Sequence, residues 1–209
     1  MEECDIMSVA IRRITPEEYV TTSWGGGATT QIAIAPAGAR YADRNFLWRV
    51  SSATVELEAS DFTSLPDYER FLSTLRGVVR VFHDGGAPLT LTPGNIHRFD
   101  GGAVTRSEGT CTDFNLMLRK GKCGGEMRCL HLGEHGEARL SRTVGPAGAR
   151  HTFLVYCAEG DGELSAAGES VRFFKGEAAQ VENAEPLLRC STASGFLLCE
   201  MAETEKSDY

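Results

Sequence analysis

The 209-residue chain lacks the features of several common protein classes. No apolar run approaches the roughly 20 residues that cross a membrane. The first residues include Glu2, Glu3 and Asp5 instead of the basic and apolar regions of a signal peptide. Positive charge is scarce, because 21 Lys and Arg stand against 29 Asp and Glu and give a net charge of -8. We therefore expect neither a membrane nor a nucleic acid as partner, whereas a small anion fits because one pocket can be locally basic.

The cysteines lack the pairing that a disulfide framework needs. There are seven, an odd number, and no two of them form a C-x-x-C motif. In a chain of this size without an export signal, this pattern is typical of reduced thiols in a cytosolic protein. The sequence therefore predicts a cytoplasmic location.

Helical periodicity is also scarce. Only residues 67–75, which follow Pro66, have helical character, and they predict one or two turns. Elsewhere, short apolar or alternating runs are separated by Gly, Pro, Asp and Asn, as in residues 31–34, 47–57, 77–82, 89–92, 113–118, 152–156, 171–174 and 195–199. Many strands at spacings of roughly ten residues predict an all-β sandwich or barrel.

The chain divides near residues 121–125, where three Gly lie close to Lys120 and Lys122 in the composition of a linker. We expect one barrel in residues 1–120, with residues 1–8 as a flexible extension, and a second in residues 121–200. The chain could also return from the second half to complete the first barrel. Residues 201–209 are acidic and poor in apolar side chains, and we expect them to be a disordered tail.

A charged residue interrupts the longest strand pattern. Alternate side chains of a strand face opposite sides, and one face here reads Leu47, Arg49, Ser51, Ala53, Val55 and Leu57. This face is apolar except for Arg49 and Ser51, so it indicates an interior with a buried guanidinium. Such a group needs an anionic partner. Two interpretations stay open: a carboxylate-binding pocket, or a structural ion pair, which the strand alone favours.

A second strand pattern shifts the balance toward a pocket. In residues 113–118, Asp113, Asn115 and Met117 share one face, opposite Phe114, Leu116 and Leu118. Polar residues again lie in an apolar run. We expect Asp113 to orient Arg49 and Asn115 to contact a ligand.

A glycine run provides a third element. Trp24 is followed by Gly25, Gly26, Gly27 and then Thr29. Glycines allow backbone N–H groups to approach a ligand closely, but the run is equally typical of a flexible loop. No Lys-Ser or Lys-Thr follows, so this is not a nucleotide-binding loop.

Metal binding is the chief alternative chemistry. The segment from Pro93 to His97 resembles the second metal motif of cupin barrels, but the first motif, with two histidines and a glutamate, is absent. One histidine is too few for a stable divalent site, so we predict no metal or other cofactor and keep His97 as the single candidate ligand. No nucleophile motif or acidic dyad is present, and we assign no catalytic residue.

Together these segments resemble the HutD/Ves family. The matching pieces lie within residues 20–120: Trp24 with the three glycines and Thr29; Phe46-x-Trp48-Arg49-Val50-Ser51-x-Ala53-x-Val55; Phe62-Thr63-x-x-Pro66-x-Tyr68-x-Arg70; and Asp113-Phe114-Asn115-Leu116-Met117. In one respect the chain departs from the family, which typically has two residues between the tryptophan and the glycines. Here Trp24 runs directly into Gly25.

The resemblance implies a bicupin, with two double-stranded β-helix (jelly-roll) barrels in tandem and without the usual cupin metal set. It also implies a regulatory role in bacterial histidine utilisation, and a small acid of that pathway, such as formylglutamate or urocanate, as the ligand. From the strand patterns, the glycine run and the resemblance together, the residues that we expect to bind the ligand are Arg49, Ser51, Asn115, Asp113, Trp24, Gly26, Gly27, Thr29 and Arg70. A homodimer, a cupin-type enzyme acting on a small organic acid, and a structural module without a pocket stay open.

Overall fold

The computed structural model describes residues 9–146 and 148–204, and strands dominate them. The described helical segments are two short 3-10 turns, η1 (Pro16–Glu18) and η2 (Tyr41–Asp43). The prediction of an all-β protein is confirmed. Within the described residues, no helix is long and apolar enough to cross a membrane.

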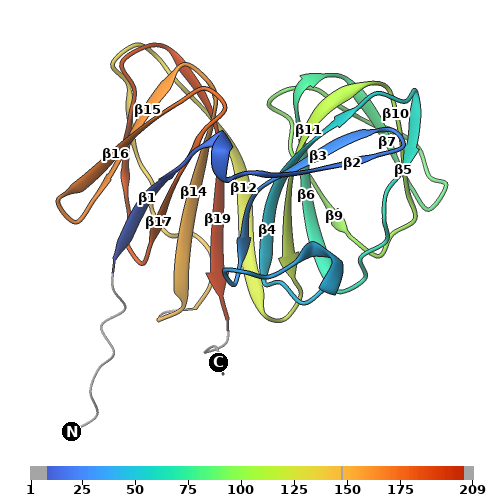
Figure 1. The fold of residues 1–209 in the computed structure, drawn as a ribbon, viewed down its shortest axis with the longest axis horizontal. Helices are drawn as coiled ribbons and strands as arrows, with labels where there is room; N and C mark the ends of the chain where they lie inside the picture. The colour runs from blue at the N-terminus through green and yellow to red at the C-terminus, as the bar shows by residue number, and fades with distance from the viewer. Residues whose placement is uncertain (1–8, 147, 205–209) are drawn as a thin grey trace, which may run out of the picture.

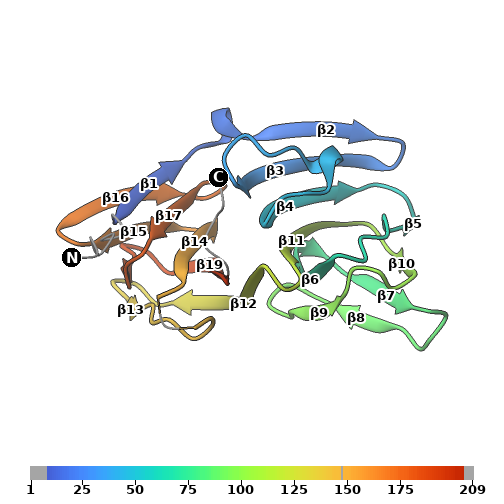
Figure 2. The same ribbon diagram turned by 90° about the horizontal axis from the view of Figure 1, so that it is seen from below.

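The strands gather into two lobes, each made of two facing sheets (Figures 1 and 2). The N-terminal lobe has a six-stranded sheet in the order β2 (Val20–Trp24), β3 (Gly27–Ala35), β4 (Trp48–Val55), β11 (Cys111–Arg119), β6 (Tyr68–Gly77) and β9 (His97–Asp100). Its second sheet has four strands in the order β5 (Ala59–Asp61), β10 (Thr105–Glu108), β7 (Val79–His83) and β8 (Leu89–Leu91).

The C-terminal lobe repeats much of this order. Its larger sheet runs β12 (Cys123–Leu132), β19 (Ser194–Glu203), β14 (Arg150–Glu159), β17 (Ala178–Glu182) and β1 (Ala10–Ile14). Its smaller sheet runs β13 (Glu137–Arg139), β18 (Leu187–Arg189), β15 (Asp161–Ala166) and β16 (Glu169–Phe174). All the paired strands are antiparallel, and no sheet of the described residues closes on itself.

The alternation of side chains determines where each core lies. One face of β4 and β11 carries Trp48, Val50, Phe114 and Leu116, which pack against Leu197 and other residues of the C-terminal lobe. The opposite faces of the two large sheets line a separate interior in each lobe. The Arg49 side chain lies on the face of β4 opposite Trp48 and Val50, inside the N-terminal lobe.

Three boundary expectations need correction. The segment predicted as helical, residues 67–75, lies in strand β6 from Tyr68 on, because hydrogen bonds to β11 on one side and β9 on the other override local propensity. The expected linker is shorter, since β12 already begins at Cys123. The prediction of a disordered tail from residue 201 is wrong for its first residues, because Met201 and Ala202 are buried in β19. The rest of that prediction, from residue 205 on, lies outside the described residues.

We expected that the second half could supply a strand to the first barrel, but the structure shows the reverse: the first half supplies a strand to the C-terminal lobe. Strand β1, from the segment that we assigned to the first half, pairs with β17 of the C-terminal lobe. In the part of the chain that the structure describes, no strand after residue 120 joins either sheet of the N-terminal lobe. The expected flexible extension, residues 1–8, lies outside the described residues.

Candidate functional site

Five of the residues predicted from the sequence come together on the interior face of the N-terminal lobe. Paired residues of antiparallel strands share a face. Met117 of β11 pairs with Arg49 on one side and with Arg70 on the other. Two residues earlier, Asn115 pairs with Ser51. Asp113 follows on the same face, and all five polar side chains are buried.

Arg49 is held by uncharged neighbours. Its Nε donates a hydrogen bond to Gln31 Oε1 at 2.9 Å, and its Nη1 donates to Ser51 Oγ at 3.0 Å. The Tyr41 ring lies over the guanidinium, with 4.5 Å from Cζ to the ring centroid. Burial lowers the pKa of Arg49 to about 10, so it is still charged at neutral pH. We expected Asp113 to orient Arg49; the structure shows that Gln31 and Ser51 do so.

Arg70 is buried without a hydrogen-bond partner for its Nε. Its guanidinium carbon lies 4.8 Å from the ring centroid of Phe62 and 5.3 Å from that of Phe99. Burial lowers the pKa of Arg70 to about 10. Within the described residues, no carboxylate lies within ion-pair distance of it, and the guanidinium lies against the two aromatic rings.

Asp113 is the carboxyl group that interacts electrostatically with both arginines, and it is a weak counter-charge. Its Oδ1 accepts a hydrogen bond from the Ala53 N–H at 2.9 Å. Burial raises the pKa of Asp113 to about 6, although that N–H and the positive charges of Arg70 and Arg49 oppose the rise. The Asn115 Oδ1 is buried without a partner. The interior therefore holds two cations, one acid whose pKa is raised, and an amide oxygen without a hydrogen-bond partner.

The C-terminal lobe shows how this fold treats a buried charge that is purely structural. Its interior is apolar around Phe153 and Leu198. Its buried acid, Glu200, accepts hydrogen bonds from the N–H groups of Thr143 and Val144 at 2.6 and 3.1 Å. The Thr143 hydroxyl and Arg128 also donate to it. Glu200 therefore accepts hydrogen bonds from three neighbouring residues, whereas the Nε of Arg70 has no partner.

The glycine run lies at the other end of the sheet. Gly25 and Gly26 form the turn between β2 and β3, and Gly27 is in register with Val55. Arg49 lies six residues away along β4, or about 20 Å at roughly 3.3 Å per residue. Of the residues predicted near the glycines, only Thr29 lies on the same face of the sheet and at the same level as Asp113, because both residues pair with Ala53.

Close packing explains two of these glycines. A Cβ on Gly27 would lie 1.8 Å from the Thr54 carbonyl oxygen, and its φ of +145° disfavours other residues. A Cβ on Gly26 would overlap the ring of Trp24, which is itself 41% exposed. The structure therefore gives this run a role in the hairpin and separates it from Arg49.

Two histidines that are distant in the sequence meet inside the same lobe. His83 Nε2 and His97 Nε2 lie 2.7 Å apart. The Thr105 hydroxyl donates to the Ala103 carbonyl, so it accepts the Nδ1 proton of His83 at 2.9 Å. His83 Nε2 is then the acceptor and His97 Nε2–H the donor. Burial lowers the pKa of both. The described residues contain no group of three or more His, Cys, Asp or Glu side chains that could hold a metal ion.

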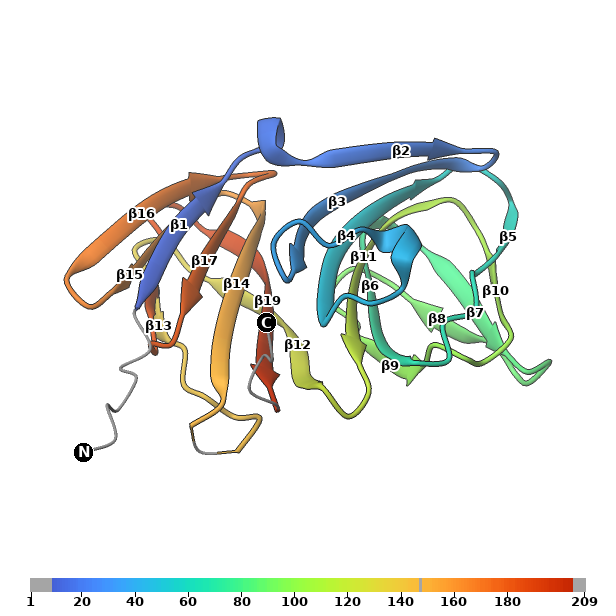
Figure 3. The ribbon, with the colours of Figure 1, turned by 60° about the horizontal axis from the view of Figure 1, so that its bottom comes forward.

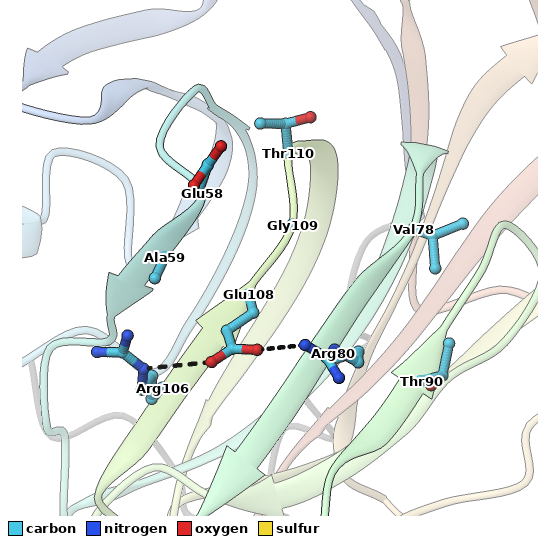
Figure 4. Close-up of a pocket in the computed structure, with 9 residues that line it drawn as sticks. All are labelled: Glu58, Ala59, Val78, Arg80, Thr90, Arg106, Glu108, Gly109 and Thr110. Carbon is cyan, nitrogen blue, oxygen red and sulfur yellow. Dashed lines mark hydrogen bonds and ion pairs between the residues drawn. The ribbon is translucent and has the colours of Figure 1, made fainter.

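An open groove of about 790 Å³ lies on the outer face of the smaller sheet of the N-terminal lobe (Figure 4). It also contains two arginines, but both are exposed and share Glu108, at 2.5 Å from Arg80 and 3.8 Å from Arg106. Because these charges are already paired and solvated, the groove is a weaker candidate than the interior pair Arg49 and Arg70.

Sequence reasoning missed several neighbours of the site. Gln31 alternates in phase with Thr29, which was a usable signal. Tyr41, Phe62, Phe99 and His83 approach from loops or other strands, and no local pattern indicates such contacts.

Comparison with known proteins gives one family and a group of similar folds. The model of the HutD family matches residues 16–198. The solved structure of PA5104 from Pseudomonas aeruginosa PAO1 has a TM-score of 0.77 and 18% identity, covering 94% of this chain and 100% of its own. HutD from Pseudomonas fluorescens SBW25, in a formate condition, has a TM-score of 0.73 and 22% identity with the same coverages. A cupin 2 conserved barrel domain protein from Leptotrichia buccalis has a TM-score of 0.55 and 13% identity, covering 95% and 99%. No curated protein matches the chain.

Proposed function

The chain belongs to the HutD family, and from this membership we propose that it is a cytosolic regulatory protein that binds a small carboxylate without transforming it. The proposed site is the interior face of the N-terminal lobe, around Arg49, Arg70 and Asn115. We also infer that each lobe is one cupin barrel, because each has two facing sheets and the two lobes share their strand order.

The observation that carries this proposal is the buried guanidinium of Arg70, whose Nε has no hydrogen-bond partner and which forms no ion pair with a described carboxylate. A buried cation without a hydrogen-bonded counter-charge costs several kcal/mol of folding free energy. Buried charges of this kind are concentrated at functional sites, where a ligand can supply the partner. Guanidinium presents a planar fork that matches a carboxylate, so a carboxylate ligand is the natural partner.

The spacing of the two arginines favours a ligand with two anionic ends. Arg49 and Arg70 lie on either side of β11, so their backbones are about 10 Å apart at roughly 4.8 Å per strand. Formylglutamate has two carboxylates and a formamide N–H, and the last could donate to the Asn115 Oδ1. Urocanate has one carboxylate. We therefore favour formylglutamate among the acids of histidine degradation.

The site is closed in this structure, because the polar side chains that form it are nearly inaccessible to solvent. Tyr41, whose ring covers Arg49, belongs to the 3-10 turn η2 outside the large sheet. A ligand reaches Arg49 when this turn moves aside, and its return would then enclose the ligand. Such a rearrangement on binding suits a protein that reports the presence of a metabolite.

Calorimetric titration with formylglutamate and with urocanate tests the proposal, alongside thermal unfolding. A ligand at a hundred times its dissociation constant adds about 2.7 kcal/mol to the free energy of unfolding. We expect Arg49→Ala to abolish the shift. The matched control is Arg80→Ala, which removes an exposed arginine of the outer groove and is expected to leave it unchanged. A shift that survives Arg49→Ala, or one lost only in Arg80→Ala, would refute the site.

One observation favours a second candidate function. The contact of 2.7 Å between His83 and His97 resembles half of a metal site and is compatible with a cupin-type enzyme acting on a small acid. Elemental analysis separates the two functions. Stoichiometric metal that disappears in His97→Ala would favour the enzyme over the non-enzymatic binding protein.

A further inference from the structure

Strand β2 is the outer edge of the large sheet of the N-terminal lobe (Figures 2 and 3). All five of its residues, Val20 to Trp24, are exposed. Alternate residues of an edge strand direct backbone N–H and C=O groups away from the sheet, where another strand can pair with them.

The other sheet edges are protected in ways that natural proteins commonly use. Short length or charged side chains block the addition of a further strand. The four sheets have two edges each, which makes eight edge strands in the described residues. Strands β5 and β8 have three residues, and β1, β9, β12, β13 and β16 all carry charged residues. Among these eight, only β2 is longer than three residues and uncharged.

The sequence of β2 is complementary to itself in one register. In an antiparallel pair centred on Thr22, each Val20 lies opposite the partner's Trp24, and each Thr21 lies opposite the partner's Ser23. Aromatic side chains opposite β-branched ones, and hydroxyl side chains opposite each other, are favourable cross-strand pairs. All five positions are therefore matched, and no like charges face each other within the strand.

We propose that β2 pairs with β2 of a second copy of this chain, about a two-fold axis at Thr22. The two large sheets then continue into one another. An isologous contact of this kind closes after two subunits, so the exposed edge is used up and no fibre grows. Trp24 and the neighbouring Leu57, both exposed here, add an apolar rim at each end. Glu18, next to the strand, is paired with Arg12 at 3.2 Å and adds little repulsion.

Light scattering after size exclusion tests this interface on the full chain. We expect a dimer in the wild type and a monomer in Thr22→Lys, because the lysine places two like charges opposite each other at the axis. The matched control is Thr90→Lys, on the exposed edge strand β8, and we expect it to stay dimeric. A monomeric wild type, or a dimer that persists in Thr22→Lys with native circular dichroism, would overturn the proposal.

Disulfide trapping tests the register itself. Residues opposite each other in antiparallel strands have Cα atoms about 4.5 to 5.5 Å apart, within reach of a disulfide. Under mild oxidation, Thr22→Cys should give a covalent dimer well above the wild-type background. Thr21→Cys should do so only when mixed with Ser23→Cys. Equal crosslinking of Thr21→Cys alone, or none of Thr22→Cys, would contradict the two-fold axis at Thr22.

Discussion

Arg49 and Arg70 flank Met117 from opposite sides of strand β11, and neither is within ion-pair distance of a described carboxylate. Arg49 donates hydrogen bonds to Gln31 and Ser51, whereas the Arg70 guanidinium lies against the rings of Phe62 and Phe99. The interior of the N-terminal lobe therefore holds two cations, for which the buried Asp113 supplies at most one counter-charge. This arrangement leads to the following predictions.

Arg70→Met should separate stability from binding. Methionine fills a similar volume beside Phe62 and Phe99 without a buried charge. The free energy of unfolding of the ligand-free variant should therefore exceed that of the wild type by about 1–4 kcal/mol. Carboxylate binding should weaken by about 2–5 kcal/mol. Urea denaturation and calorimetric titration measure the two quantities. A variant that is less stable and still binds would mean that Arg70 has a structural partner instead.

The stability of Asp113→Asn should diverge from that of the wild type as the pH rises. Burial raises the pKa of Asp113 to about 6. The pKa of this carboxyl is therefore higher in the folded state than in the unfolded state. The contribution of the protonated Asp113 to stability is fully present below about pH 4 and is lost as the pH rises through about 6. Asparagine keeps the acceptor for the Ala53 N–H and does not ionise.

Denaturation of both proteins from pH 4 to pH 7.5 measures this effect. The two should be equally stable at pH 4, and Asp113→Asn should be more stable by up to about 3 kcal/mol above pH 7. His83 and His97 titrate in both proteins, so their effect cancels in the difference. A constant difference across this range would show that the Asp113 carboxyl titrates at an ordinary pKa.

Affinity for a carboxylate should depend on the same proton. The Asp113 carboxylate repels an anion bound between the arginines, and its protonation removes that repulsion. We therefore expect binding to tighten as the pH falls through about 6, a range in which the ligand carboxylates stay largely ionised. Asp113→Asn should bind more tightly than the wild type at pH 7 and show a flatter pH profile. The two dissociation constants changing in parallel with pH would rule out this linkage.

Gly27→Ala should damage the fold and leave the ligand site intact. The new Cβ would overlap the Thr54 carbonyl oxygen at a φ of +145°, and we expect a loss of about 1–3 kcal/mol of stability. Gly25→Ala is the matched control, because nothing lies within 4 Å of its Cβ. Thermal unfolding should separate the two variants, and calorimetry at low temperature should find equal affinity. Lost affinity in a folded Gly27→Ala would restore the ligand role that the sequence suggested for the glycines.

Alternation along single strands made part of this site predictable. It assigned Arg49 and Ser51 to one interior face and Asp113 and Asn115 to another, and pairing between β4 and β11 joins these faces in the structure. Alternation is local and regular, so it transfers well from sequence to structure. The failed prediction of a helix at residues 67–75 shows the limit, because pairing on both sides of β6 decided that segment.

The remaining contacts depend on register and loops. Gln31 reaches Arg49 across a pairing whose register shifts between Gln31 and Ala33, a detail that the sequence does not encode locally. His83 and His97 meet because they lie on two different sheets that face each other. The resemblance grouped Trp24 with Arg49, but a long hairpin separates them.

An electron-density map of the protein crystallised with formylglutamate tests the central claim most directly. The account predicts density inside the N-terminal lobe, with one carboxylate on Arg49, the other on Arg70 and the amide near Asn115, and with the turn at Tyr41 displaced from its position here. Density confined to the outer groove beside Arg80, or an interior holding only water at saturating ligand, would contradict it.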